Sequence, residues 1–316
     1  MAQSAAEMPE RANQTHPTNQ SHLANQTQRA NQSHRAGETY RRIAVTKLCG
    51  AAGAEIDGVD LSQAIDAETV AEIRRAFLEN CVIAFRGQDL APERQIAFTE
   101  IFGKVEQHPL YRGNAIEGFP DILVLEHKAG QFINGKNDIW HSDITFSETP
   151  PLGSVLHCRA VWEGYADTMF ANQYLAFEAL SEPLKRLFDG MTAEYDAALL
   201  RTLNNSQNYN APMGAIPPPV VHPVVRTHPE TGRKALFVNC AYTTRLLGVT
   251  AEESKRLLDF LYAHCTRPDF VYRHRWRVGD VVMFDNRCLL HYVVQDHPFD
   301  MHRRMHRTTA SGDRPF

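Results

Sequence analysis

Apolar residues recur along this chain at two spacings, and these predict a mixture of short helices and short strands. Val70, Ile73 and Phe77 form one apolar face of a helix expected over Glu68–Leu78. A buried strand over Cys81–Phe85 should follow it directly. Further helices are expected over Arg94–Phe102, over Asn172–Phe188 with a break near Ser181-Glu182-Pro183, and from Thr250 to about His264, where Thr250 and Glu253 form a capping box.

Short apolar runs separated by turn residues predict strands through the rest of the chain. These strands are expected near Ile122–Leu125, Val220–Arg226, Ala235–Asn239, Phe270–Trp276, Val281–Phe284 and Arg303–Thr309. The turn Pro229-Glu230-Thr231-Gly232 should join two of them as a hairpin. Many short strands with a few covering helices favour an α+β fold with a mainly β core, a barrel or jelly roll, over a parallel sheet.

The first 39 residues have a different composition from the rest. Asn-Gln recurs every six residues at Asn13, Asn19, Asn25 and Asn31, and almost no apolar side chain lies between the repeats. Such a segment cannot offset the entropy lost on ordering. We therefore expect residues 1–39 to be a disordered tail and residues 40–316 to be the folded domain.

Composition limits the partners that this chain can have. The net charge is −4 and the basic residues are scattered, so no nucleic-acid surface is expected. No apolar run approaches the ~20 residues of a membrane span, and the N-terminus lacks a signal-peptide core. The six cysteines form no regular framework, which favours reduced thiols in a cytoplasmic protein.

His141 and Asp143 are the first candidates for chemistry. In an extended run from Ile139 to Phe146 they would point to the same side, because side chains alternate along a strand. His291, about 150 residues later, could complete a face of two histidines and one carboxylate. Such a triad leaves coordination positions open and suits non-haem Fe(II) that activates O2.

Other interpretations of these residues remain open at this point. An isolated histidine is more often structural than a ligand, and a Zn(II) hydrolase can also use two histidines and a carboxylate. A small-molecule-binding barrel without catalysis is a further alternative. Two arginines on one side of a late strand, Arg303 and Arg307, favour an oxygenase because they provide an anion clamp that a hydrolase would not need.

Six motifs in order along the chain resemble those of the TauD/TfdA family of Fe(II)- and 2-oxoglutarate-dependent dioxygenases, and the taurine and alkylsulfonate branch in particular. The resemblance extends from about Tyr40 to Phe316. The motifs are Gly53-Ala54-Glu55-Ile56-Asp57-Gly58-Val59-Asp60-Leu61, Trp140-His141-Ser142-Asp143-Ile144-Thr145-Phe146, Asp167-Thr168, His222-Pro223-Val224-Val225-Arg226-Thr227-His228-Pro229, Asp285-Asn286-Arg287 and Arg303-Arg304-Met305-His306-Arg307.

The resemblance implies a double-stranded β-helix, a jelly roll with helices packed outside, and a metal site in its mouth. It assigns His141, Asp143 and His291 to Fe(II), as the catalytic centre. Thr168 and Arg303 match the pair that holds 2-oxoglutarate, and Arg307 adds a second cation to this clamp. Iron, O2 and 2-oxoglutarate are thus the implied cofactors, and the family habit implies a homo-oligomer, either a dimer or a tetramer.

For the substrate, the resemblance implies a small anionic molecule, an organosulfonate that is hydroxylated to give sulfite and an aldehyde, with succinate and CO2 as coproducts. His108, Tyr111, Asn137 and Arg307 match substrate-binding positions. The chain departs from the pattern at Cys240-Ala241-Tyr242, where Tyr242 would place a hydroxyl in the pocket. Alkyl sulfate esters and aryloxyacetates therefore remain alternatives to taurine and alkanesulfonates.

Overall fold

The fold is described over residues 39–110, 114–130, 139–198 and 215–316, in a computed structural model. The expected tail up to residue 38 and the candidate residues Tyr111 and Asn137 lie outside these ranges. Tyr40–Phe316 form one compact unit. Within the described ranges, no helix has both the length and the apolar character needed to cross a membrane.

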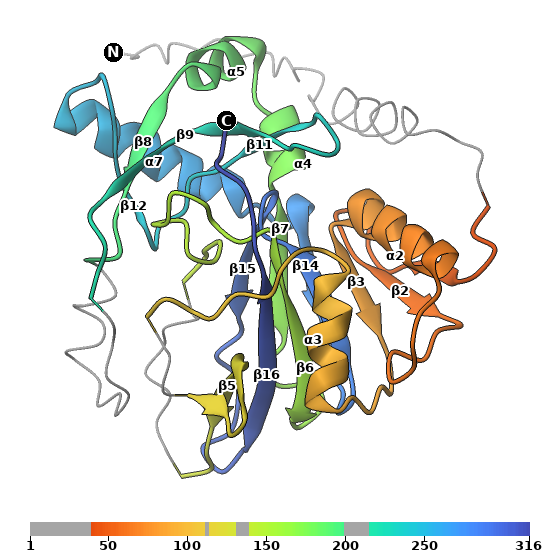
Figure 1. Cartoon of the computed structure of the whole chain (residues 1–316). Helices are drawn as coiled ribbons and strands as arrows, with labels where there is room; N and C mark the ends of the chain where they lie inside the picture. The colour runs from red at the N-terminus through yellow and green to blue at the C-terminus, as the bar shows by residue number, and fades with distance from the viewer. Residues whose placement is uncertain (1–38, 111–113, 131–138, 199–214) are drawn as a thin grey trace, which may run out of the picture. The chain divides into compact units, whose positions relative to one another are not determined.

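An eight-stranded sheet forms the larger layer of the fold, in the order β1-β2-β3-β14-β6-β16-β5-β4 (Figure 1). Its strands are β1 (Ala44–Lys47), β2 (Ala54–Asp57), β3 (Val82–Phe85), β4 (Ala115–Ile116), β5 (Phe119–His127), β6 (Gly153–Ala160), β14 (Val281–Asp285) and β16 (Arg303–Ala310). Only the β2–β3 pair is parallel among these described strands. The central strand β14 is a nearly continuous apolar run, and β6 is buried from Gly153 to Cys158, because both faces of these strands are covered.

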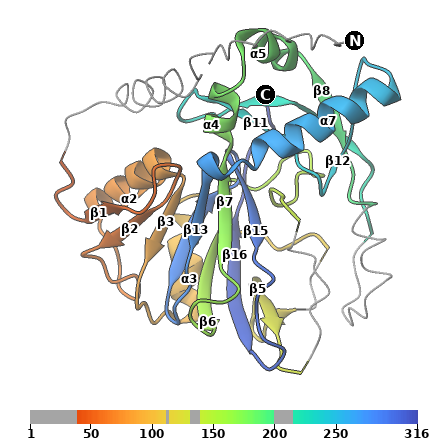
Figure 2. The ribbon, with the colours of Figure 1, turned by 180° about the vertical axis from the view of Figure 1, so that it is seen from behind.

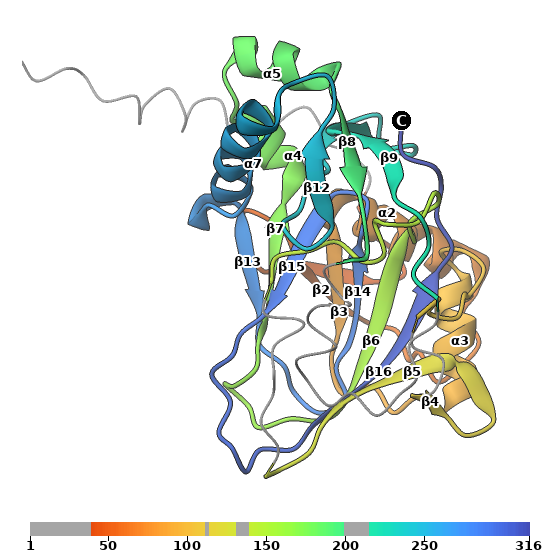
Figure 3. The ribbon, with the colours of Figure 1, turned by 90° about the vertical axis from the view of Figure 1, so that its left-hand side faces the viewer.

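A smaller antiparallel sheet faces this layer and consists of β13 (Val271–His274), β7 (Thr168–Asn172) and β15 (Leu289–Val293). Seen from the side, the two sheets stand as separate layers (Figure 3). Phe170 of the smaller sheet packs against Phe284 of the larger one, with ring centroids 5.3 Å apart. The apolar core between the layers also includes Leu156 and Met305.

Two helices cover the outer face of the large sheet. They are α2 (Ala67–Asn80) and α3 (Pro92–Glu100), and their residues Phe77 and Phe98 pack into a core with Phe85 and Met283 of the sheet. Asp66 caps the first helix by accepting from the backbone N–H groups of residues 68 and 69. The helices therefore turn their apolar faces inward, as their spacing predicts.

A third group of elements lies beyond one end of the two sheets (Figure 2). It contains α4 (Gln173–Glu178), α5 (Glu182–Asp189), α7 (Ala251–Cys265) and the 3₁₀ turn η1 (Pro268–Phe270), with the strands β8 (Thr192–Tyr195), β9 (Val220–Pro223), β10 (Val225–Thr227), β11 (Lys234–Leu236) and β12 (Thr243–Leu246). The predicted capping box of Thr250 and Glu253 is present at the start of α7. The predicted hairpin joins β10 to β11.

Some predicted boundaries and one predicted strand are wrong. The run expected over Ala235–Asn239 ends at Leu236, and the run expected from Phe270 begins as the 3₁₀ turn. The segment that continues from His141 to Phe146 is not a strand, because only His141 makes a β-bridge and residues 143–146 form a turn. Ile144 has a positive φ of 54°, which an extended strand excludes.

Candidate metal centre and anion sites

His141, Asp143 and His291 converge between the two sheets, with His291 on β15 and Asp143 against Ser154 of β6. Each offers one ligand atom, and these atoms lie within 4.8 Å of one another. The bridge between the backbones of His141 and His291 brings the histidines together, with N···O distances of 3.1 and 2.7 Å for its two hydrogen bonds. The structure thus unites the three residues that sequence analysis selected, although a turn and not a strand presents the carboxylate.

The two oxygens of the Asp143 carboxylate have different surroundings. Oδ2 accepts a hydrogen bond from the Ser154 hydroxyl at 3.1 Å and lies 3.0 Å from Nη2 of Arg307. Oδ1 lies 3.9 Å from Nε2 of His141 and 3.8 Å from Nε2 of His291. One oxygen is therefore held by the protein, while the other faces the two imidazoles.

Burial and neighbouring charges set the protonation of these groups. Burial is the main cause that lowers the pKa of His141, and it lowers the pKa of His291 to about 3. Burial alone would raise the pKa of Asp143, but Arg307 and the histidines outweigh it and hold that pKa below its usual range. At neutral pH the cluster therefore has two neutral imidazoles and one carboxylate, the forms that bind a metal.

The arrangement of donors fits a single metal ion. Two donors that share a metal at bond lengths of ~2.1 Å lie at most ~4.2 Å apart; the two carboxylate–imidazole separations, 3.9 and 3.8 Å, lie within this limit, and all three ligand atoms lie within 4.8 Å of one another. Nδ1 of His141 lies 2.7 Å from the carbonyl oxygen of Ile139, which orients Nε2 toward the cluster. Two histidines and one carboxylate suit Fe(II) with open coordination positions.

The predicted cosubstrate residues lie on the two facing sheets. Thr168 begins β7 on the same side of the small sheet as His291, since it pairs with Val293 two residues beyond that ligand. Its hydroxyl oxygen accepts a hydrogen bond from the indole N–H of Trp276 at 2.9 Å. The hydroxyl proton of Thr168 therefore remains free to be donated to another acceptor.

Arg303 is a buried guanidinium at the start of β16. Burial lowers its pKa to about 10, so it remains a cation at neutral pH. Its Nε has no hydrogen-bond partner among the described residues. A buried cation with an unsatisfied donor is costly, and a bound anion would remove that cost.

Three of the predicted substrate residues, His108, Tyr242 and Arg307, are described, and all three lie near the metal cluster. Burial, together with the nearby charge of Arg307, lowers the pKa of His108 to about 3, so the imidazole is neutral at neutral pH. Tyr242 stands edge-on to His141, with ring centroids 6.4 Å apart, and packs on Phe146 at 5.1 Å. Tyr111 and Asn137 lie outside the described residues, so their predicted role remains a prediction.

Sequence analysis gave no role to Ser154, Trp276 or Asn286, which all contact the candidate residues. Asn286 binds the backbone of Asp143 through its side-chain amide. The motif Asp285-Asn286-Arg287 was noticed, but its spacing from Asp143 carries no signal of a contact. Ser154 lies in β6, a buried strand that was not predicted.

Comparison with known proteins places this architecture among characterised relatives. Residues 44–309 match the family described as Taurine catabolism dioxygenase TauD, TfdA family. An alkylsulfatase from Acinetobacter baylyi is 34% identical over 289 residues, which cover 86% of this chain and 86% of the relative. An alpha-ketoglutarate-dependent 2,4-dichlorophenoxyacetate dioxygenase from Cupriavidus pinatubonensis is 34% identical over 273 residues, covering 82% of this chain and 94% of that one.

A solved structure agrees with these matches. The crystal structure of a taurine dioxygenase from Burkholderia xenovorans superposes with a TM-score of 0.73 and is 33% identical, over 87% of this chain and 93% of that chain. The matched part of the sequence includes every described candidate residue from His108 to Arg307.

Proposed function

We propose, from the premise that this chain belongs to the TauD/TfdA family of Fe(II)- and 2-oxoglutarate-dependent dioxygenases, that it hydroxylates a small organosulfonate. As an enzyme of this family it uses Fe(II), 2-oxoglutarate and O2. Membership of the family removes the hydrolase and the non-catalytic barrel as alternatives. The sulfonate and the individual residue roles form the proposal.

The first part of the proposal assigns the metal to His141, Asp143 and His291. Their separations, burial and protonation support this assignment. Bound iron supplies O2 activation, coupled to the oxidative decarboxylation of 2-oxoglutarate to succinate and CO2. The protein keeps both imidazoles neutral and one carboxylate oxygen facing them.

The second part assigns the far carboxylate of 2-oxoglutarate to Arg303 and Thr168. The guanidinium of Arg303 can donate two parallel hydrogen bonds to a carboxylate, and the Thr168 hydroxyl can donate a third. The buried, unpartnered Nε of Arg303 supports a bound anion there. Arg303 and Arg307 are four residues apart on β16, roughly 13 Å of strand, so we assign Arg303 to the far end of the site. Arg307, which the resemblance also counted in this clamp, is assigned to the metal end.

The observation that carries the substrate proposal is the buried guanidinium of Arg307 beside the metal ligands. Its Nη2 lies 3.0 Å from Asp143, and no other acidic partner of Arg307 is found among the described residues. His108 adds a neutral imidazole whose Nδ1 accepts from the N–H of Leu110 at 3.1 Å, so the ring proton is carried by Nε2. One cation and one neutral donor suit the oxygens of a sulfonate.

The proposed reaction balances with O2 and 2-oxoglutarate as co-reactants. One oxygen atom enters the C–H bond at the carbon that bears the sulfonate, and the other enters succinate. The hydroxylated carbon then loses its C–S bond, with the electron pair leaving on sulfite, while the hydroxyl proton is released and an aldehyde forms. The residues bind the anion and place this carbon; the cofactor performs the oxidation.

An alkyl sulfate ester is the second candidate substrate, because one relative of 34% identity is an alkylsulfatase. A sulfate ester presents the same three anionic oxygens to Arg307 and His108. An aryloxyacetate is the third candidate, since another relative acts on 2,4-dichlorophenoxyacetate. Tyr242, placed edge-on to His141, is proposed to line the substrate pocket in each case.

The proposal extends to the fold type, the assembly and the location of the protein. The two facing sheets support a double-stranded β-helix, the jelly roll expected from the resemblance. We propose a cytoplasmic homo-oligomer, a dimer or a tetramer, whose partners are small anions and neither nucleic acid nor membrane. Residues 40–316 would be the catalytic domain, with residues 1–39 as a tail.

A substrate panel tests the proposed function. The Fe(II) enzyme is incubated with 2-oxoglutarate, O2 and either taurine, other alkanesulfonates, alkyl sulfates or aryloxyacetates, and succinate is measured with sulfite, sulfate or phenol. Sulfite formed in step with succinate is the expected result for an alkanesulfonate, with taurine below the best substrate. If sulfite stays at the level of the no-enzyme control while sulfate or phenol rises, the sulfonate proposal is wrong.

A further inference from the structure

The side chain of Asn286 makes three hydrogen bonds in the interior of the protein. Its Oδ1 accepts from the backbone N–H of Asp143 at 2.6 Å. Its Nδ2 donates to the backbone oxygen of Asp143 at 2.9 Å and to that of Pro151 at 3.1 Å. Asn286 is only 1% exposed, so water does not compete for these bonds.

This contact replaces the neighbouring strand that the metal-ligand segment lacks. His141 is held by its bridge to His291, and the Ser142 hydroxyl donates to the carbonyl oxygen of Leu289 at 2.6 Å. The chain then turns away at Asp143, where no ladder bond is made. Asn286 therefore supplies the donor and the acceptor that would otherwise come from a paired strand.

A buried ion-pair network fixes the turn from which Asn286 projects. Asp285, at the end of β14, accepts from Arg287 Nε at 2.9 Å and from Arg287 Nη2 at 2.7 Å. Its Oδ2 also lies 3.0 Å from Nε2 of His228. The pKa of Asp285 is held below its usual range, because Arg287 and His228 outweigh the effect of burial. The residues on both sides of Asn286, Asp285 and Arg287, are thus held in place by their ion pair.

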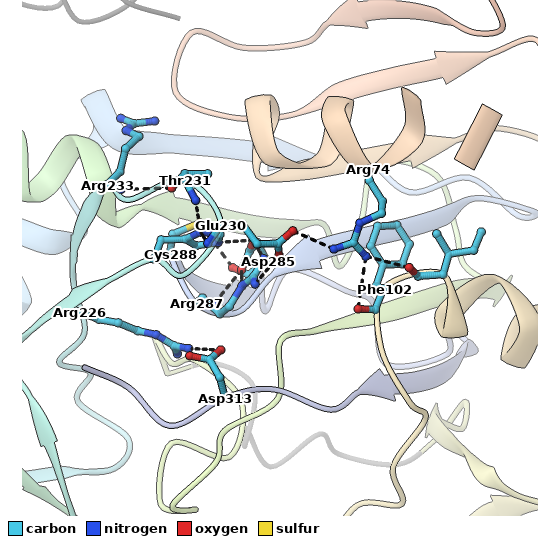
Figure 4. Close-up of polar contacts among 12 residues, drawn as sticks. Arg74, Phe102, Arg226, Glu230, Thr231, Arg233, Asp285, Arg287, Cys288 and Asp313 are labelled. Carbon is cyan, nitrogen blue, oxygen red and sulfur yellow. Dashed lines mark hydrogen bonds and ion pairs between the residues drawn. The ribbon is translucent and has the colours of Figure 1, made fainter. Parts of the chain in front are cut away.

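The network continues to the helix α2 through the β10–β11 turn (Figure 4). Arg287 Nη1 donates to Glu230 at 2.7 Å, and the other oxygen of Glu230 accepts from Arg74 at 2.8 Å. Arg74 also donates to the carbonyl oxygen of Ile101 at 2.8 Å. Arg287, in the turn between β14 and β15, is therefore linked to the β10–β11 turn and, through Glu230, to the helix α2.

The turn at residues 286–288 leads directly into β15, the strand that carries the metal-ligand candidate His291. Cys288 ends it, and β15 with His291 begins at the next residue. On the other side, the N–H of Asn286 donates to Leu152 at 2.9 Å, just before β6 begins at Gly153. A Cβ atom at Gly153 would collide with the carbonyl oxygen of Phe284, so glycine lets β6 approach β14 closely there and brings Ser154 to Asp143.

We propose that Asn286 is a positioning residue for the metal centre. Its hydrogen bonds to the backbone of Asp143 keep that residue where Oδ1 of its carboxylate lies close to Nε2 of both histidines. This inference rests on the proposed metal ligands. Asn286 touches neither metal nor substrate and acts only through Asp143. Residues of this kind change metal affinity by roughly 10–100-fold when removed.

Metal binding to the apo-protein separates this role from a general role in stability. Asn172 is a matched control, because it is also a buried asparagine that binds backbone groups, at Ala51 and at the start of α4, but contacts no metal ligand. The dissociation constant for Co(II) is measured by titration for the wild type, Asn286→Ala, Asn172→Ala and Asp143→Ala, together with the melting temperature of each and the visible spectrum of bound Co(II).

Asn286→Ala should raise the Co(II) dissociation constant about 10–100-fold and change the Co(II) spectrum. Asn172→Ala should lower the melting temperature but bind Co(II) with the same dissociation constant as the wild type. Wild-type affinity in Asn286→Ala, with lost affinity in Asp143→Ala, would overturn the positioning role and leave the metal site standing. Wild-type affinity in Asp143→Ala would overturn the metal site itself.

Two further outcomes complete the test. An equal loss of affinity in Asn172→Ala would show a general effect of destabilisation and overturn the positioning role. If Asn286→Ala does not fold, Asn286→Ser takes its place, because one short hydroxyl cannot serve both backbone groups of Asp143. The serine variant should bind Co(II) more weakly in the same way, and wild-type affinity there would contradict the proposal.

Discussion

Arg307 and Asp143 form an ion pair inside the metal centre, with 3.0 Å between Nη2 and Oδ2. The pair links the strand that carries the anion clamp to the turn that carries the carboxylate ligand. Arg307 therefore has two tasks in our account. It lies against Oδ2 of Asp143, so that Oδ1 would be the oxygen offered to a metal, and it would offer its remaining donors to the substrate anion.

Replacing Arg307 should separate substrate binding from cosubstrate binding. Arg307→Gln removes the charge that faces the substrate, so the substrate KM should rise at least tenfold, the loss of about 1.4 kcal/mol or more. The KM for 2-oxoglutarate should change less than threefold, roughly 0.7 kcal/mol. Steady-state kinetics with each ligand varied in turn measures both values.

The control for this variant is Arg304→Gln, on the opposite face of the same strand. It should leave both KM values near those of the wild type. An unchanged substrate KM in Arg307→Gln would remove Arg307 from the substrate site.

The cosubstrate clamp is tested by Arg303→Lys. An ammonium group cannot copy the two parallel hydrogen bonds of a guanidinium, so binding of 2-oxoglutarate should weaken by about 1–3 kcal/mol. Thr168→Val should act in the same direction but less strongly, since it removes one neutral donor. Dissociation constants of 2-oxoglutarate for both variants give the measurement.

Arg304→Lys serves here as a test of register, because Arg304 adjoins Arg303 in the sequence and is the other arginine that could fill the clamp position. If Arg304→Lys weakens 2-oxoglutarate binding and Arg303→Lys does not, the assignment of the clamp is off by one residue.

The network around Asp285 should make stability depend on pH in a defined direction. The folded protein holds the pKa of Asp285 below its usual range, so the unfolded chain binds more protons at low pH. The stabilisation is fully present above the unfolded pKa of about 3.9 and is lost as pH falls below it. Asp285→Asn should therefore cost about 3–5 kcal/mol at pH 7.

The measurement is the free energy of unfolding in urea between pH 7 and pH 3 for the wild type and Asp285→Asn. The difference between them should narrow as pH falls below about 4. A difference that stays constant over this range would mean that Asp285 gains nothing from being ionised in the folded protein.

Deleting residues 1–37 should leave the enzyme essentially unchanged. The segment contains almost no apolar side chain that could dock on the domain. The melting temperature and the rate of succinate formation of residues 38–316 should match those of the full chain. A clear loss of either would show that the Asn-Gln repeat packs on the domain or reaches its active site.

Local signals in the sequence predicted the elements that depend on local interactions. The helix α7 was recognised because Thr250 and Glu253 satisfy its first N–H groups and its apolar residues follow one face. The strand β6 was missed because both of its faces are buried, so Ser154 and His157 interrupt an otherwise apolar run without marking a surface.

The residues around the metal site were also predicted only in part from the sequence. Residue types and a family pattern selected His141, Asp143 and His291, whose convergence agrees with the structure. The turn at Asp143 was taken for a strand because its apolar residues alternate, while the side chain that replaces a strand partner, Asn286, lies 143 positions away. Contacts between such distant residues depend on the tertiary fold and have no local signal.

The most direct test of the account is succinate formation by His141→Ala, Asp143→Ala and His291→Ala, each assayed with Fe(II), 2-oxoglutarate, O2 and the best substrate of the panel. Circular dichroism confirms that each variant is folded. The account predicts that every one of the three loses Fe(II)-dependent succinate formation while its fold remains. Near-normal succinate formation by any one of them would contradict the assignment of these residues to the metal.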